Sequence, residues 1–178
     1  MKVLFETPFF DFVNTGDKHG LLIKRNSVAV LPYTVDANGI VEQIGILHEW
    51  NTLREGNYAN TLITGSIDDS DEDAYATAVR ELFEEGGFDM RGESPDKWLF
   101  LGTFHDSKDS NREIPTFAVD VTGMEQGSPS TDGSSQESKS TLKMTDVNEA
   151  VLTNELLVLG SFLRLFNIMY RKSFKNAK

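Results

Sequence analysis

The chain of 178 residues is long enough for one domain with its own core, because a domain of this size buries roughly two thirds of its unfolded surface. Its formal net charge of -11 argues against a nucleic-acid partner, whose phosphates are bound by lysine and arginine. The absence of cysteine excludes disulfides, a thiolate nucleophile and cysteine-based zinc sites, and fits a reducing cytoplasm. Glu6 and Asp11 interrupt the first apolar run, so a signal peptide is not expected.

The first clear elements are two β-branched, apolar stretches at 26–35 and 39–50, separated by the turn residues 36–39. Such a pattern predicts a β-hairpin. A short strand is expected at 60–64, leading into Gly65, an acidic loop and a helix from about 73 to 86. Further strands are expected at 97–104, 114–121 and 141–145.

The stretch 123–140 is rich in glycine and serine and cannot bury enough apolar surface to fold alone. We expect a mobile loop there, which is either a lid over a site or a disordered insertion. From about residue 153 the sequence is dense in apolar residues, and the polar residues Arg164 and Asn167 interrupt this stretch. This predicts a packed core helix rather than a membrane span. All 178 residues are read as a single domain.

The helix at 73–86 has an unusual charge distribution. Glu81, Glu84 and Glu85 fall within one arc of its surface, at the helix end where the dipole disfavours acids. The opposite arc carries an apolar stripe that can pack on a sheet, formed by Tyr75, Val79, Leu82 and Phe83. A solvated surface is the simplest reading of the acidic face, but like charges at these spacings cost about 0.2 to 0.5 kcal/mol each.

A hard divalent cation such as Mg²⁺ would remove that repulsion and commonly bridges carboxylates to substrate phosphates. A calcium EF-hand is the competing interpretation of the acidic loop starting at Asp69. It fails, because its sixth position is Ala74 rather than glycine and its twelfth is Arg80 rather than glutamate. The pattern favours a magnesium site that serves a phosphorylated substrate.

The stretch that starts at Glu72 resembles the signature of the Nudix hydrolases, G-x5-E-x7-R-E-U-x-E-E-x-G-U, where U is a bulky apolar residue. From Glu72 the match is complete: seven residues are followed by Arg80, Glu81, Leu82, Phe83, Glu84, Glu85, Gly86, Gly87 and Phe88. The departure lies at the start. Gly65 stands seven residues before Glu72 where the signature has six, so the loop carries one extra residue, or Ser66 takes the glycine position.

The resemblance implies an α/β/α sandwich with a mixed central β-sheet. It also implies that Glu81, Glu84 and Glu85 bind Mg²⁺ or Mn²⁺, with a backbone carbonyl of Thr64 or Gly65 as a further ligand. Glu72 and Arg80 look like the structural pair of the signature, and an arginine there can orient carboxylates through charge-assisted hydrogen bonds. A plain helix salt bridge is the other interpretation of Arg80.

The implied activity is hydrolysis of a nucleoside diphosphate linked to another moiety, a small-molecule substrate that needs neither nucleic acid nor membrane. Residues 7–10 and 26–34 are similar to the start of ADP-ribose and nucleotide-sugar pyrophosphatases in this family. Tyr33, Trp50 or Trp98 could stack a base, although each ring is more often packing. Asn51 stands where those relatives often have an arginine, and a homodimer is possible.

The resemblance leaves more than one function open. A non-catalytic Nudix module that senses a nucleotide or binds a partner is the main rival, followed by hydrolases of nucleoside triphosphates or dinucleoside polyphosphates. An RNA cap remover fits the acidic composition poorly. The general base is unsettled: Glu137 in the long loop is most similar to the loop glutamate of some family members, Glu81 is the alternative, and Glu113 is a weaker one.

Overall fold

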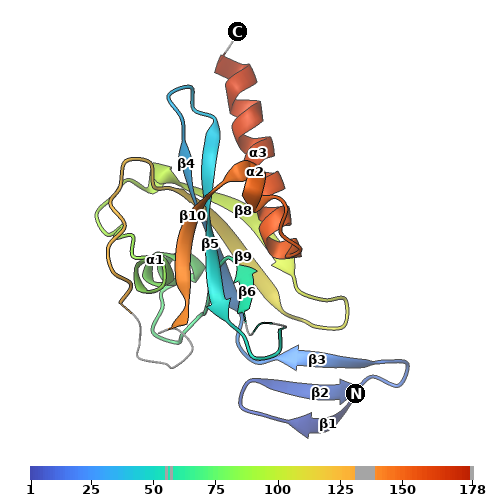
Figure 1. Ribbon diagram of the computed structural model, residues 1–178. Helices are drawn as coiled ribbons and strands as arrows, with labels where there is room; N and C mark the ends of the chain where they lie inside the picture. The colour runs from blue at the N-terminus through green and yellow to red at the C-terminus, as the bar shows by residue number, and fades with distance from the viewer. Residues whose placement is uncertain (55, 57, 131–138, 177–178) are drawn as a thin grey trace.

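The computed structural model describes residues 1–54, 56, 58–130 and 139–176 (Figure 1). Its main body is one mixed sheet of seven strands, with the order β10-β5-β4-β9-β8 and two further strands, β6 on β5 and β7 on β4. The strands are β4 Ser27–Val35, β5 Val41–Trp50, β6 Tyr58–Thr61, β7 Ile63–Ser66, β8 Trp98–His105, β9 Glu113–Asp120 and β10 Thr141–Asp146. Among these described strands only β4 and β9 pair in parallel, which makes the sheet mixed as expected.

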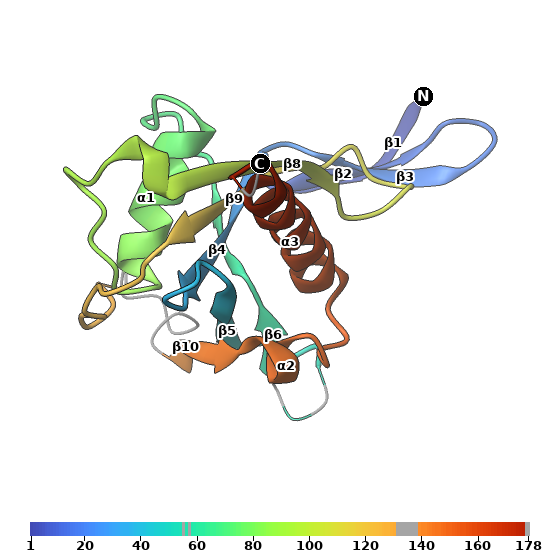
Figure 2. The ribbon, with the colours of Figure 1, turned by 90° about the horizontal axis from the view of Figure 1, so that it is seen from above.

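Helices cover both faces of this sheet, and Figure 2 shows its strands between α1 and α3. The helix α1 spans Ala74–Glu84, and α3 spans Leu156–Asn176 after a short α2 at Val147–Ala150. One apolar cluster, including Ile63 and Leu82, joins α1 to the sheet, and a second joins α3 to the opposite face. The predicted α/β/α sandwich is therefore confirmed. Within the described ranges, no helix has both the length and the apolar character to cross a membrane.

The predicted hairpin and helix form for local reasons. Asp36 closes the β4–β5 turn by accepting hydrogen bonds from the backbone N–H groups of Asn38 and Ile40, both at 2.8 Å. Asp73 caps α1, because its side chain accepts from the backbone N–H of Ala76 at 2.8 Å. Gly87 follows the helix with φ of 74°, a conformation that favours glycine. The expected strand at 60–64 is instead two short strands, which part at Leu62.

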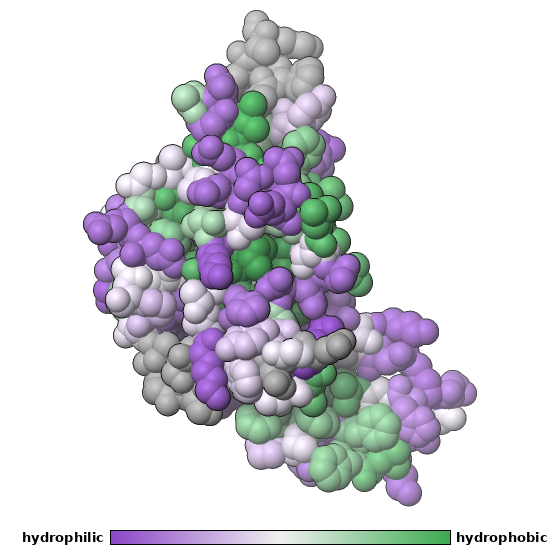
Figure 3. All heavy atoms as spheres, in the orientation of Figure 1, coloured by the Kyte–Doolittle hydropathy of each residue, from purple (hydrophilic) through white to green (hydrophobic). Residues whose placement is uncertain are grey.

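An amino-terminal sheet of three strands was not expected. It contains β1 Lys2–Glu6, β2 Phe10–Asn14 and β3 His19–Ile23, and it stands at one end of the main body (Figure 1). The loop before β9 holds it, since the backbone N–H of Leu21 donates to the Asp109 carbonyl at 2.8 Å. Apolar side chains gather on it, at the lower right of Figure 3, and the exposed large ones are Met1, Val3, Leu4, Phe5, Phe9, Phe12 and Leu21.

The long loop follows β9 and is described only in its flanks, residues 123–130 and 139–140. Its first flank packs on the end of α1: the backbone N–H of Gly127 donates to the Gly87 carbonyl at 2.9 Å. A Cβ at Gly87 would collide with the Gly127 carbonyl, so this approach requires glycine. Glu137 lies outside the described residues, as does the rest of the stretch 131–138 in the loop that we expected to act as a lid or an insertion.

Candidate functional site

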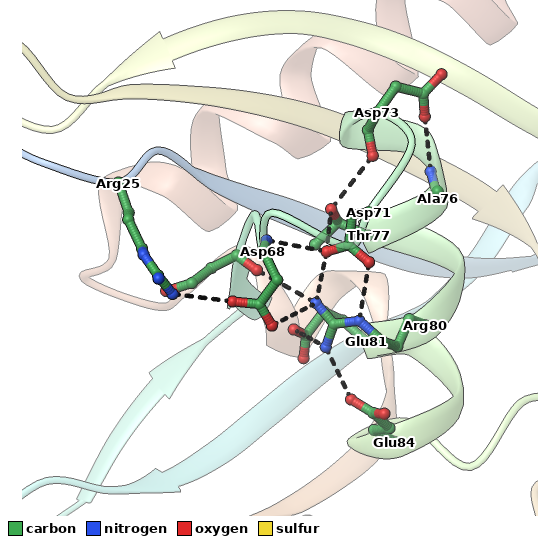
Figure 4. A network of polar contacts seen from close by, with 10 residues as sticks. Arg25, Asp68, Asp71, Asp73, Ala76, Thr77, Arg80, Glu81 and Glu84 are labelled. Atoms are coloured by element: carbon green, nitrogen blue, oxygen red, sulfur yellow. Dashed lines mark hydrogen bonds and ion pairs between the residues drawn. The ribbon is translucent and has the colours of Figure 1, made fainter.

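The Arg80 side chain, on α1, is the centre of a network of carboxylates (Figure 4). Its Nη2 lies 2.9 Å from Asp71 Oδ2, and its Nη1 lies 2.7 Å from Glu81 Oε1 and 3.0 Å from Glu84 Oε2. Nη2 also donates to the backbone carbonyl of Ser66 at 3.2 Å. The hydrogen bonds to Asp71, followed by the charge of Glu81 and the bond to Glu84, raise the pKa of Arg80. The guanidinium therefore ties the loop before α1 to the acidic face of the helix.

The acid that pairs with Arg80 is Asp71, whose side chain is only 9% exposed. It also accepts from the Thr77 hydroxyl at 2.9 Å and from the backbone N–H of Asp68 at 3.0 Å. The hydrogen bonds from Arg80, ahead of the other contacts, lower the pKa of Asp71 to about 2. Asp71 is thus held ionised in a fully hydrogen-bonded position.

The expected pair of Glu72 and Arg80 is corrected by this geometry. Glu72 is exposed, and among the described residues it makes no hydrogen bond or ion pair to Arg80. Asp71 stands six positions after Gly65, which is the spacing of glycine and glutamate in the signature. The extra residue therefore lies between Asp71 and Arg80 rather than before the acid. The spacing from Gly65 to Asp71 could have revealed the pairing of Asp71 with Arg80 from the sequence. The complete match of the signature from Glu72 onward favoured Glu72 instead.

The three glutamates of the helix occupy different environments, although their spacing predicted one shared acidic face. Glu81 is 8% exposed and lies against Gly65 at the end of β7, where a Cβ would collide with its carboxyl group. The side chain of Glu84 is 33% exposed. Glu85 caps the helix, and its backbone N–H donates to the Glu81 carbonyl at 2.9 Å. Gly65 is thus the position that lets Glu81 reach the sheet.

The side chains expected to bind a metal fit Mg²⁺ in their chemistry. Carboxylate oxygens are the ligands that this ion prefers. Of the three glutamates expected to bind it, Glu81 and Glu84 converge on Arg80, and so does Asp71, which was not among the expected ligands. Across residues 1–54, 56, 58–130 and 139–176, no three acidic or histidine side chains are already arranged as a metal cluster. Glu81 and Glu84 instead form ion pairs with Arg80 Nη1.

The aromatic residues expected to stack a base are not gathered at this site. Tyr33 is 4% exposed and belongs to the core beneath α3, where burial raises its pKa to about 12, so the prediction for this residue is wrong. Trp50 is partly buried at the end of β5, with Tyr58 against its ring edge-on and the Lys139 Nζ 4.4 Å from the ring centre. Trp98 packs edge-on against Tyr75 of α1.

Of the candidate bases, Glu81 is in the network, and Glu113 is exposed at the start of β9. The backbone N–H of Glu113 donates to the Asn26 side chain at 3.5 Å. Glu137 falls in the undescribed stretch.

Two cavities of suitable size lie near the sheet. One, of about 460 Å³, is bordered by Ser66 and Arg25, whose Nη1 lies 3.1 Å from Asp68 Oδ1. It therefore adjoins the Arg80 network directly. The other, of about 350 Å³, is lined by His48 and Lys143 among others, and shares no lining residue with that network.

No protein-family model and no curated protein matches the sequence. Solved structures do match. An ADP compounds hydrolase is 14% identical, with a TM-score of 0.65 over 96% of this chain and 92% of that one. An Ap4A hydrolase from C. elegans, solved as a binary complex, is 16% identical, with a TM-score of 0.56 over 83% of this chain and 98% of that one. This chain has the fold of both structures.

Proposed function

We propose that the protein is a Mg²⁺-dependent pyrophosphohydrolase that cleaves a nucleoside diphosphate linked to another moiety. The observation that carries the proposal is the convergence of Asp71, Glu81 and Glu84 on Arg80 beside Gly65, within a Nudix signature on a Nudix fold. Purely structural pairing would need fewer acids, because Asp71 alone already satisfies two nitrogens of the guanidinium. The similar structures, both named as hydrolases of nucleotide compounds, support the same class of reaction.

The chain's own residues divide the work in this proposal. Glu81, Glu84 and Glu85, with a backbone carbonyl of Thr64 or Gly65, would hold Mg²⁺ or Mn²⁺. The ion would supply neutralisation of phosphoryl charge and a lowered pKa for an attacking water. Arg80 and Asp71 fix the loop against the helix, so that Glu81 keeps its place beside Gly65. Glu81 or Glu137 would accept the proton of the water.

The proposed substrate is ADP-ribose or a nucleotide sugar. A dinucleoside polyphosphate is the second candidate, favoured by the similarity to the Ap4A hydrolase. A nucleoside triphosphate hydrolase and a non-catalytic sensing module are the rival functions that the experiment must separate from these two. The homodimer stays a prediction.

The test is a screen of these nucleotides with Mg²⁺, in which phosphate is measured after phosphatase treatment. Glu84→Gln and Glu85→Gln should each lower kcat by about 100-fold or more with the fold intact. Glu93→Gln is the matched control, because it makes the same chemical change in an exposed ion pair with Lys97. Wild-type turnover in both site variants would place the metal elsewhere, and a protein without turnover on any substrate would support the sensing module.

A further inference from the structure

The cavity of about 460 Å³ lies between the amino-terminal sheet and the start of β4. The residues that matter for its chemistry are Phe9, Phe10, Arg25, Ser27, Ser66 and Arg112. Two of them lead to the acidic network: the Ser66 carbonyl accepts from Arg80, and Arg25 pairs with Asp68. A molecule bound in this cavity would therefore extend from the amino-terminal sheet to the acids around Arg80.

Arg112 brings a positive charge to the cavity that the described residues do not neutralise. Its Nη2 donates to the Ser27 hydroxyl at 2.6 Å, which fixes the side chain beside β4. Its Nε is buried without a hydrogen-bond acceptor, and Arg112 takes part in no ion pair within the described ranges. A buried donor without an acceptor carries a desolvation cost. An anionic ligand would remove this cost.

Arg25 is the second guanidinium in the cavity, and its acidic partner among the described residues is the half-exposed Asp68. Two arginines with this one acid give the cavity a local excess of positive charge in a chain with a net charge of -11. Guanidinium groups suit phosphate oxygens, because their planar donors can bind two oxygens at once. The charge of the cavity therefore favours a phosphate group.

An exposed aromatic ring stands at the same cavity. Phe9 is 73% exposed, although it lies in an ordered turn. The Thr7 hydroxyl holds this turn by accepting from the backbone N–H groups of Phe9 at 3.1 Å and Phe10 at 2.9 Å. An uncovered aromatic ring on an ordered turn can stack a nucleobase, whatever the base.

We propose that this cavity binds the nucleoside monophosphate part of the substrate, with its phosphate on Arg112 and its base on Phe9. This inference rests on the proposed function for its substrate class and adds the place where that substrate is recognised. The cavity beside His48 is the competing location, but it has no residue in common with the Arg80 network. Ser27, which holds Arg112, pairs with Ser66 across β4 and β7, so a phosphate on Arg112 would lie on the side of the cavity that leads to Arg80 and its acids.

The test measures binding rather than turnover. Calorimetric titration of the full chain without metal uses two probes, AMP and ribose 5-phosphate, which share the phosphate and differ in the base. Arg112→Gln should weaken both probes by about tenfold or more, because it removes a charge-assisted contact. Phe9→Ala should weaken AMP by about fivefold or more through lost stacking and leave ribose 5-phosphate within about twofold.

Arg171→Gln is the charge-matched control, since Arg171 is exposed near the carboxyl end of α3. That end of the helix points away from the amino-terminal sheet (Figure 1). It should leave both dissociation constants within about twofold. Thermal unfolding checks that Arg112→Gln folds. If it does not, Phe9→Ala still decides, because an exposed side chain contributes little to folding and its effect must differ between the two probes.

Equal affinity of AMP for wild type, Arg112→Gln and Phe9→Ala would overturn the proposal, as would wild-type protein that binds neither probe. A His48→Ala variant that loses AMP while the other two keep it would move the nucleotide to the competing cavity. The binding measurement does not depend on turnover. If the variants change the affinities as expected but the protein has no hydrolase activity, only the proposed function is refuted. Hydrolase activity without those changes in affinity would refute this inference alone.

Discussion

The pairing of Arg80 with Asp71 rather than Glu72 can be tested by removing one negative charge at each position. Asp71→Asn keeps the shape of the side chain and an oxygen that can still accept from Thr77, so it isolates the ion pair. Glu72→Gln makes the equivalent change at the neighbouring acid, which is exposed. The structure predicts that the first variant is destabilised and that the second is not.

The size of the effect follows from the pKa of Asp71. A pKa lowered from its ordinary value of 3.8 to about 2 corresponds to about 2.4 kcal/mol of stabilisation of the charged form. The side chain is 9% exposed, so solvent screens the pair only in part. Because Arg80 keeps Glu81 and Glu84 as partners, we expect Asp71→Asn to lower the free energy of unfolding by about 2 kcal/mol. Glu72→Gln should change it by less than about 0.5 kcal/mol.

The assay is urea unfolding followed by the fluorescence of Trp50 and Trp98, at neutral pH and at several lower values. A depressed pKa means that the unfolded state takes up the proton first as pH falls. The contribution of Asp71 is therefore complete above its ordinary pKa of 3.8 and is lost as the pH falls toward 2. The difference between wild type and Asp71→Asn should shrink over that range, whatever the other carboxylates do.

A loss in Glu72→Gln equal to or larger than the loss in Asp71→Asn would refute the reasoning, because it would make Glu72 the partner of Arg80. A difference between wild type and Asp71→Asn that is the same at neutral pH and near pH 2 would also refute it.

Three further predictions concern activity. Gly65→Ala should lower kcat by about 100-fold or more in the Mg²⁺ assay, because the added Cβ would displace the Glu81 carboxyl group. An unchanged kcat would show that activity does not require the Glu81 carboxyl group beside residue 65. Glu137→Gln should lower kcat by about 100 to 10,000-fold if Glu137 is the base. A loss below about tenfold at saturating Mg²⁺ excludes it and leaves Glu81. ADP-ribose should yield AMP and a ribose phosphate on chromatography, and faster turnover of a nucleoside triphosphate would contradict this substrate.

The sequence alone determined the elements that depend on neighbouring residues. The hairpin of β4 and β5 and the helix α1, which ends just before Gly86 and Gly87, were predictable, because turn residues, caps and hydrophobic spacing act within a few positions. The spacing of Glu81, Glu84 and Glu85 predicts a metal site by the same local logic, and that site stays a prediction. A signature of this kind records local geometry, which is independent of the rest of the chain.

Only the tertiary structure decided which of these residues meet. Asp71 and Glu72 are adjacent in sequence, and the path of the loop from β7 to α1 turns the first toward Arg80 and leaves the second in solvent. Tyr33 has the chemistry of a stacking residue, but its place in the sheet buries it beneath α3. Arg112 meets Ser27 across 85 positions of sequence. Such contacts are set by how strands pair and how helices pack on them, and no short stretch of sequence encodes that arrangement.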